Sequence, residues 1–158
     1  GWYGDSSRMV CVGKPGVKAR KLVEITYESL MRAIEIVRPG VTLGDIGHVI
    51  QSFVEKHQLM MEGGIQVNAL GRRFHEPPNI MHSGHPGEGL AVVEGMIFTI
   101  EPMVNAGKAG TKILADGWTA VTKDRSLSAQ FEHSIGVTAT GCEIFTLSPG
   151  GHHYPIAP

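Results

Sequence analysis

The sequence predicts an α+β fold in which two amphipathic helices pack on an antiparallel sheet. Apolar residues recur at helical spacing through residues 17–57, with one break at Pro39-Gly40. From Glu62 onward, glycines and prolines divide the chain into short runs rich in β-branched residues. With 158 residues, of which 42% are hydrophobic and 18% charged, the chain has the composition of one globular domain.

The first helix is expected over residues 17–38, where Pro39-Gly40 stops the pattern. The second begins with an N-cap signature, Thr42 placed three residues before Asp45. The apolar positions expected to face the core are Val23, Tyr27, Leu30, Ile34 and Val37 in the first helix, and Ile46, Ile50, Phe53 and His57 in the second.

The strands are expected as short runs joined by tight turns. One run, Met9–Gly13, precedes the helices, and four follow them at residues 96–100, 119–122, 134–138 and 143–147. Helices followed by a set of short strands favour a layer of helices on one antiparallel sheet.

Charge and composition exclude some classes of partner. Fourteen basic and fifteen acidic residues leave a net charge of −1, which argues against nucleic acid or an anionic membrane as the main partner. No apolar run approaches the roughly 20 residues that span a bilayer. Cys11 and Cys142 lie far apart without metal-binding spacing, which favours buried thiols in a reducing compartment. We therefore expect a cytoplasmic protein.

Three carboxylates stand in unusual places. Glu101 ends the apolar run FTIEPMV, Glu132 lies inside SAQFEHSIGV, and Asp5 follows the apolar start GWYG. A carboxylate in a strand either points to water or, when buried, needs a hydrogen bond, an ion pair or a metal. Carboxylates from separate strands are typical of hard divalent-metal sites, so we hold a metal site and a solvated surface as alternatives.

Two further residues have a chemical and a plain interpretation. His75, in GRRFHEPPNIMHSGH, lies in a stiff loop that can present an imidazole to a cleft, or it is an exposed loop histidine. Trp118, in ADGWTAV, is a core residue by default, with a pocket wall as the alternative.

Taken together, FTIEPMVNAG, DGWTAVTKDRSLSAQFEHSI and GRRFHEPP resemble the bacterial type I methionine aminopeptidases of the pita-bread metallopeptidase family. These motifs occur in the family's order, from the first residue to about Leu147. The resemblance implies half of a pita-bread fold, with two helices on a curved antiparallel sheet. Residues 1–147 would form this domain and residues 148–158 a tail.

The resemblance also implies roles for individual residues. Asp5, Glu101 and Glu132 match three ligands of a divalent-metal pair, which in the family is Mn, Co, Fe or Zn. His75 matches a catalytic histidine near the scissile bond. Phe74 and Trp118 match residues that line the methionine pocket.

Two departures from the family pattern are expected to matter. Asn68 occupies the place of the family's histidine ligand, and an amide oxygen should weaken binding of zinc, cobalt or iron more than binding of manganese, magnesium or calcium. The alternative is that Asn68 is a structural loop residue and the metal has been lost. The chain matches the C-terminal half of the family's fold, so the first Asp ligand and the N-terminal half would lie outside it.

Three interpretations of function follow. In the first, the chain is part of an enzyme that removes initiator methionine once an N-terminal half or partner chain completes it. In the second, it is a non-catalytic pita-bread half that recognises a peptide, a protein N-terminus or a subunit. In the third, it is a bare fragment of a longer enzyme. We expect no useful cleavage of Met-Ala peptides by this chain alone. We also expect self-association through an apolar face near Trp2 and Tyr3.

Overall fold

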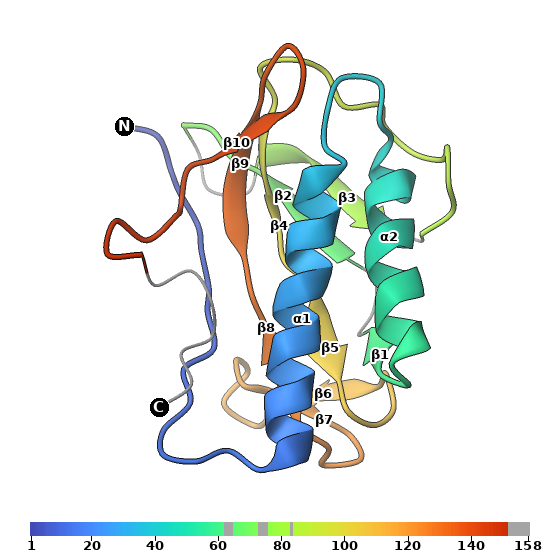
Figure 1. Cartoon of the computed structure of the whole chain (residues 1–158), viewed down its shortest axis with the longest axis vertical. Coiled ribbons are helices and arrows are strands. Elements are labelled where there is room, and N and C mark those ends of the chain that lie inside the picture. The colour runs from blue at the N-terminus through green and yellow to red at the C-terminus, as the bar shows by residue number, and fades with distance from the viewer. Residues whose placement is uncertain (62–64, 73–75, 83, 152–158) are drawn as a thin grey trace.

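The computed structural model describes residues 1–61, 65–72, 76–82 and 84–151 (Figure 1). These residues form two α-helices, α1 (Val17–Glu35) and α2 (Leu43–Lys56), and ten strands. The strands are β1 (Met60–Met61), β2 (Ile65–Ala69), β3 (Glu76–His82), β4 (Ile97–Ile100), β5 (Met103–Asn105), β6 (Thr111–Ile113), β7 (Ala120–Thr122), β8 (Ser128–Gln130), β9 (His133–Val137) and β10 (Cys142–Ile144).

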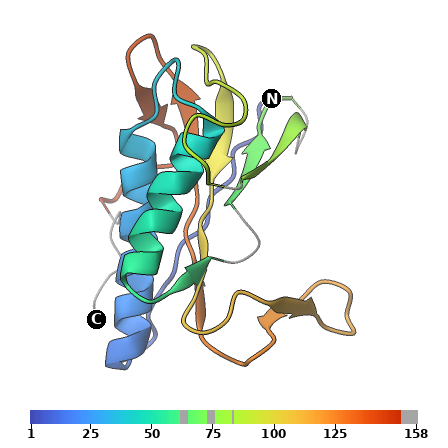
Figure 2. The same cartoon turned by 90° about the vertical axis from the view of Figure 1, so that its right-hand side faces the viewer.

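The strands form three antiparallel sheets. The largest has the order β10-β9-β4-β2-β3, a second has the order β1-β5-β8, and β6 pairs only with β7. Both helices lie on one side of the large sheet, and the β6–β7 hairpin projects from the body (Figure 2). This is the α+β layer arrangement that the sequence predicts. The bounds of β4, β7 and β9 lie within one residue of the expected runs, whereas β10 ends three residues before the expected run 143–147 does.

The core lies between the helices and the large sheet. Its apolar side chains from α1, α2, β4 and β9 are inaccessible to solvent, among them Leu30, Ile46, Ile50, Ile100 and Ile135. Burying a side chain of this size stabilises the fold by about 1.5–3 kcal/mol. The core therefore holds β4 and β9, which carry the candidate site, against the helix layer.

Helix α1 ends three residues before the predicted boundary. The Val37 N–H donates to the Ile34 carbonyl, which tightens the last turn, and Gly40 has a φ of 92°. Val37 still packs in the core, so the apolar pattern continued past the helix itself.

Helix α2 begins with the predicted cap. The Asp45 N–H donates to Thr42 Oγ1, and the Thr42 N–H donates to the Asp45 carboxylate at 2.8 Å. The inner face differs from the prediction at its C-terminal end. Val54 is buried there, whereas Phe53 and His57 are half-buried and contact each other edge to face.

The predicted strand at residues 9–13 is wrong. The N-terminal segment runs extended beside β9 (Figure 1), but among the described residues its one β-bridge is Ser7 to Glu132. Val12 is 97% exposed. An apolar run becomes a strand only where a neighbouring strand supplies hydrogen bonds, and the described residues supply none at 9–13.

No helix in the described part of the chain is long and apolar enough to cross a membrane.

Candidate metal centre

Two buried glutamates lie opposite each other on neighbouring strands. β4 and β9 are antiparallel, with Thr99 opposite Ser134. Two residues further in the same register, Glu101 stands opposite Glu132, and directly opposed side chains share a face with Cβ atoms about 5 Å apart. Glu101 is 7% exposed and Glu132 is 5% exposed. The alternative in which both carboxylates are solvated is therefore wrong.

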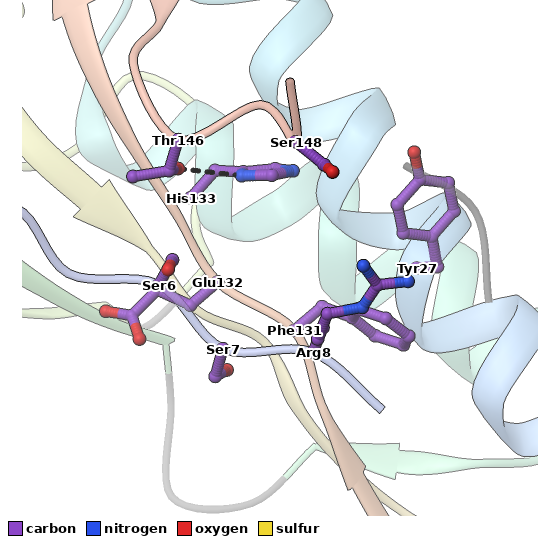
Figure 3. A pocket seen from close by; sticks show the side chains of 9 residues that line it. All are labelled: Ser6, Ser7, Arg8, Tyr27, Phe131, Glu132, His133, Thr146 and Ser148. Atoms are coloured by element: carbon purple, nitrogen blue, oxygen red, sulfur yellow. Dashed lines mark hydrogen bonds between the residues drawn. The ribbon is translucent and has the colours of Figure 1, made fainter. Parts of the chain in front are cut away.

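The glutamates lie on the sheet face that points away from the helices. Side chains alternate along a strand, so Phe131 and His133 face the helix side while Glu132 faces the other. Figure 3 shows this directly, with the Glu132 carboxylate directed away from Phe131 and the α1 residue Tyr27. Thr99 and Ser134 share the face of the glutamates.

The N-terminal segment brings a third carboxylate to this face. The Asp5 N–H donates to Ser134 Oγ at 2.9 Å, and the Ser134 hydroxyl donates to the Asp5 carbonyl at 2.6 Å. Two residues further, the Glu132 N–H donates to the Ser7 carbonyl at 3.0 Å. These bonds anchor the segment along β9 and place Asp5 beside the glutamate pair.

The charges of the three carboxylates oppose one another's ionisation. Burial raises the pKa of Glu101 to about 7, and the charge of Asp5 adds to this rise. Burial raises the pKa of Glu132 to about 8, with further contributions from the charges of Glu101 and Asp5. Like charges that cannot reach water oppose one another's ionisation. A bound cation removes that opposition.

Hydrogen bonds at the site act in the opposite direction. Gln130 Nε2 donates to Glu101 Oε2 at 3.0 Å, and this bond lowers the pKa of Glu101. The Thr99 hydroxyl lies within hydrogen-bonding reach of both glutamates and lowers the pKa of each. These two residues orient the carboxylates without neutralising them.

Buried polar atoms without hydrogen-bond partners indicate whether a metal fits this site. Glu132 Oε1 and Ser7 Oγ are both buried and make no hydrogen bond to the residues that the structure describes. Ser7 and Glu132 form a β-bridge, so their side chains lie on the same face. A buried carboxylate oxygen without a donor is costly. Oxygen donors of this kind fit a hard divalent cation.

The described residues do not by themselves form a closed metal-binding group. Within residues 1–61, 65–72, 76–82 and 84–151, no three His, Cys, Asp or Glu side chains are arranged closely enough to hold an ion. Asp5, Glu101 and Glu132 influence one another's pKa through their charges.

Trp118, another predicted site residue, lies away from the core. Trp118 lies in the turn of the β6–β7 hairpin and is 88% exposed, so the prediction of a core residue is wrong. Asp116 Oδ1 fixes this turn by accepting from the N–H groups of Trp118 and Thr119. The structure does not bring Trp118 to the three carboxylates. Its role as a pocket wall stays a prediction.

Asn68 lies on β2, next to the strand that carries Glu101. The pairing of β2 with β3 shifts register between Val67 and Ala69, and Ala69 pairs with Phe98 of β4. The backbone at Asn68 therefore approaches β4 near the site. Phe74 and His75 fall outside the described residues, and their predicted roles stay predictions.

Sequence reasoning missed the polar residues around the carboxylates. Thr99 and Ser134 are buried, Gln130 bonds to Glu101, and Ser7 pairs with Glu132. A signal for two of them was present, because Thr99 and Glu101, like Glu132 and Ser134, are separated by the strand period of two. Gln130 and Ser7 depend on pairing between distant segments.

Comparison with protein families gives a match along most of the chain. The model of metallopeptidase family M24 matches residues 1–139. Methionine aminopeptidase of Rickettsia prowazekii (strain Madrid E) is 53% identical over 156 residues, covering 98% of this chain and 60% of that protein. Methionine aminopeptidase of Escherichia coli (strain K12) is 48% identical over 147 residues, covering 93% of this chain and 56% of that protein. The chain thus spans less than two thirds of the curated relatives it matches.

Solved structures match in fold as well. The crystal structure of the R. prowazekii enzyme is similar with a TM-score of 0.89 at 52% identity, covering 92% of this chain and 59% of that one. The crystal structure of methionine aminopeptidase from Thermotoga maritima is similar with a TM-score of 0.89 at 40% identity, covering 93% of this chain and 59% of that one. The predicted architecture, half of a pita-bread fold with two helices on an antiparallel sheet, is confirmed.

Proposed function

The chain belongs to metallopeptidase family M24, and on this basis we propose that it is the part of a methionine aminopeptidase that carries most of the carboxylate ligands. The proposed reaction is removal of the initiator methionine from newly made proteins. The observation that carries the proposal is the meeting of Asp5, Glu101 and Glu132 on one face, with an unpartnered buried oxygen on Glu132.

In this proposal the three carboxylates hold a divalent metal. A divalent metal held there would supply Lewis-acid chemistry, namely polarisation of a carbonyl and a lower pKa for a bound water. Glu101 and Glu132 supply oxygens from opposed strands, so the paired backbones set the separation of the ligands. Gln130 and Thr99 keep the glutamates oriented. Asn68 offers an amide oxygen in place of imidazole, which favours manganese over zinc, cobalt or iron.

The substrate side of the proposal follows the family. His75 is assigned as the catalytic residue near the scissile bond, and Phe74 and Trp118 as walls of the methionine pocket. The partner is a peptide or protein N-terminus, with the remaining groups supplied by an N-terminal-half chain or by a second copy. The proposed compartment is the cytoplasm.

Manganese binding tests the proposal. Mn²⁺ is titrated into the 158-residue chain, and the free ion is followed by electron paramagnetic resonance. We expect saturable binding that weakens at least tenfold in Glu101→Gln and in Glu132→Gln. Glu143→Gln is the matched control, because Glu143 is an exposed glutamate on β10. Equal affinity in all four proteins would show that the carboxylate face is not the metal site.

Cleavage of a Met-Ala-Ser peptide is measured with the same samples. We expect no useful turnover by the chain alone. Robust turnover that is lost in Glu132→Gln would contradict that expectation, and it would mean that these 158 residues contain every group the reaction needs.

One observation favours a second candidate function, a non-catalytic protein that recognises a peptide or a partner subunit. Asn68 stands at the position where the resemblance places the family's histidine ligand. This candidate predicts peptide binding that EDTA does not change. Asn68→His distinguishes the two, because restored tight zinc binding would indicate a degenerate but assembled metal site.

A further inference from the structure

A second feature lies on the other side of β9, facing the helices. It is a cavity of about 240 Å³ between the N-terminal segment, α1, β9 and the residues after β10. A water molecule has a share of about 30 Å³ in the liquid, so the cavity has room for a polyatomic ligand. Glu132 and Ser7 belong to the lining of this cavity as well as to the carboxylate face, and the Glu132 carboxylate points away from Phe131 and Tyr27 (Figure 3).

Aromatic rings form one wall of the cavity. Phe131, two residues before β9, and Tyr27 from α1 meet edge to face, with ring centroids 5.3 Å apart and an interplanar angle of 69°. Both residues are buried, so this wall is fixed by the core.

Hydrogen-bond donors also line the cavity. Figure 3 shows the Arg8 guanidinium directed into the space between Ser148 and Tyr27, with the Ser148 hydroxyl beside the His133 ring. Within the described part of the chain, the one ion pair joins Arg32 to Glu28. The charge of Arg8 therefore meets no carboxylate at ion-pair distance among these residues. Arg8 is exposed, which leaves the cavity open to an exchanging ligand.

A hydrogen-bond chain orients the histidine at the cavity wall. The Ser134 N–H donates to Thr146 Oγ1 at 3.1 Å, and Thr146 Oγ1 lies 2.8 Å from His133 Nδ1. Because Thr146 already accepts one hydrogen bond, its own hydroxyl proton suits donation to Nδ1. That assignment puts the ring proton on Nε2, at the end of the ring nearest Ser148.

From this arrangement we propose that the cavity binds a small oxyanion, a carboxylate or a phosphate, with Arg8 as its main ligand and Ser148 as a second donor. A guanidinium presents its N–H groups in a planar fork that matches the two oxygens of such an anion. The hydroxyl adds a donor, and the aromatic wall excludes water from one side. The proposal does not depend on the metal centre or on peptidase activity.

The test uses the 158-residue chain with EDTA, so that phosphate cannot act through a metal. Sodium phosphate and sodium acetate are titrated separately at constant ionic strength set with sodium chloride, and the Arg8 Nε–H resonance and the unfolding temperature are followed. We expect saturation with a dissociation constant of about 1 mM for the preferred anion. The tighter of the two titrations identifies a phosphate or a carboxylate ligand.

Three variants decide the outcome. Arg8→Gln should weaken binding at least tenfold, and Ser148→Ala should weaken it about threefold to tenfold. Arg38→Gln is the control, because Arg38 is an exposed arginine that does not line the cavity. Equal stabilisation of Arg8→Gln and Arg38→Gln would mean a general salt effect and would overturn the proposal. Absence of saturation with both anions in the parent chain would overturn it as well.

Discussion

Replacing Glu132 by glutamine should make the metal-free chain more stable at neutral pH. Burial and two neighbouring carboxylates raise the pKa of Glu132 from 4.5 to about 8. Since the folded state holds this proton more tightly than the unfolded state, the stability associated with it is complete below pH 4.5. It is lost as the pH rises toward 8. The parent chain should therefore lose stability between pH 5 and pH 8.

The structure bounds the size of this effect. A rise in pKa of about 3.5 corresponds to at most ~4.8 kcal/mol at 1.36 kcal/mol for each pKa unit. Asp5 is half-buried, so water reaches one side of the site, and relaxation there reduces the cost of the charge. We expect Glu132→Gln to be more stable than the parent by about 2 kcal/mol at pH 8. At pH 5, half a pH unit above the unfolded-state pKa of 4.5, the two should differ by less than about 1 kcal/mol.

Urea unfolding at pH 5, 6, 7 and 8, with EDTA present, measures both chains. Glu143→Gln is the control, since an exposed glutamate should leave the pH dependence unchanged. Parallel stability curves for the parent and Glu132→Gln would refute the reasoning, because they would mean that Glu132 ionises in the folded chain as it does in water. Added Mn²⁺ should reverse the trend in the parent alone, since a metal stabilises the ionised carboxylates.

Three smaller predictions concern other positions. Asp45→Asn should lower the free energy of unfolding by about 1 kcal/mol at pH 7, measured by urea unfolding. Hydrogen bonds from Thr42 and Gly87 lower the pKa of Asp45, so the difference should shrink as the pH falls below 3.8. Gly44→Ala should lower the free energy of unfolding by about 2–4 kcal/mol, because the added Cβ would overlap the backbone carbonyl of Glu88. Gly16→Ala is the control; its Cβ would stand in open space, so stability should change by less than about 0.5 kcal/mol. Ser7→Ala should stabilise the metal-free chain by up to about 1 kcal/mol in thermal unfolding, because it removes a buried hydroxyl without a partner among the described residues. A loss of stability would show that this hydroxyl has a hydrogen-bond partner.

The sequence predicted the helices better than the ends of the chain. Helical spacing and the Thr42–Asp45 cap are local signals, and both helices appear close to their expected bounds. The run at 9–13 carried an equally clear strand pattern, yet Val12 is almost fully exposed. Strand formation depends on a neighbour, and a single sequence does not reveal which segments will pair.

The same distinction applies to the candidate site. Glu101 and Glu132 could be singled out because each interrupts an apolar run. Their direct opposition follows from the register of β4 and β9, which no local pattern determines. The bonds from Ser134 to Asp5 connect residues 129 positions apart and could not be anticipated. Trp118 was misjudged as core because an aromatic residue in a β-rich run usually packs inward.

The register that places Glu101 opposite Glu132 also governs which changes in length the chain can tolerate. Residues 106–127 between β5 and β8 lie outside the β4–β9 ladder, so insertions there should leave the spacing of the two carboxylates intact. A single residue added within β4 before Glu101 would instead turn that side chain toward the helices and place a charge in the core. Loop insertions and strand insertions of equal length would thus have opposite consequences for the site. Engineered variants that keep the carboxylate pair should vary the chain in the loops and preserve the residue count of β4 and β9.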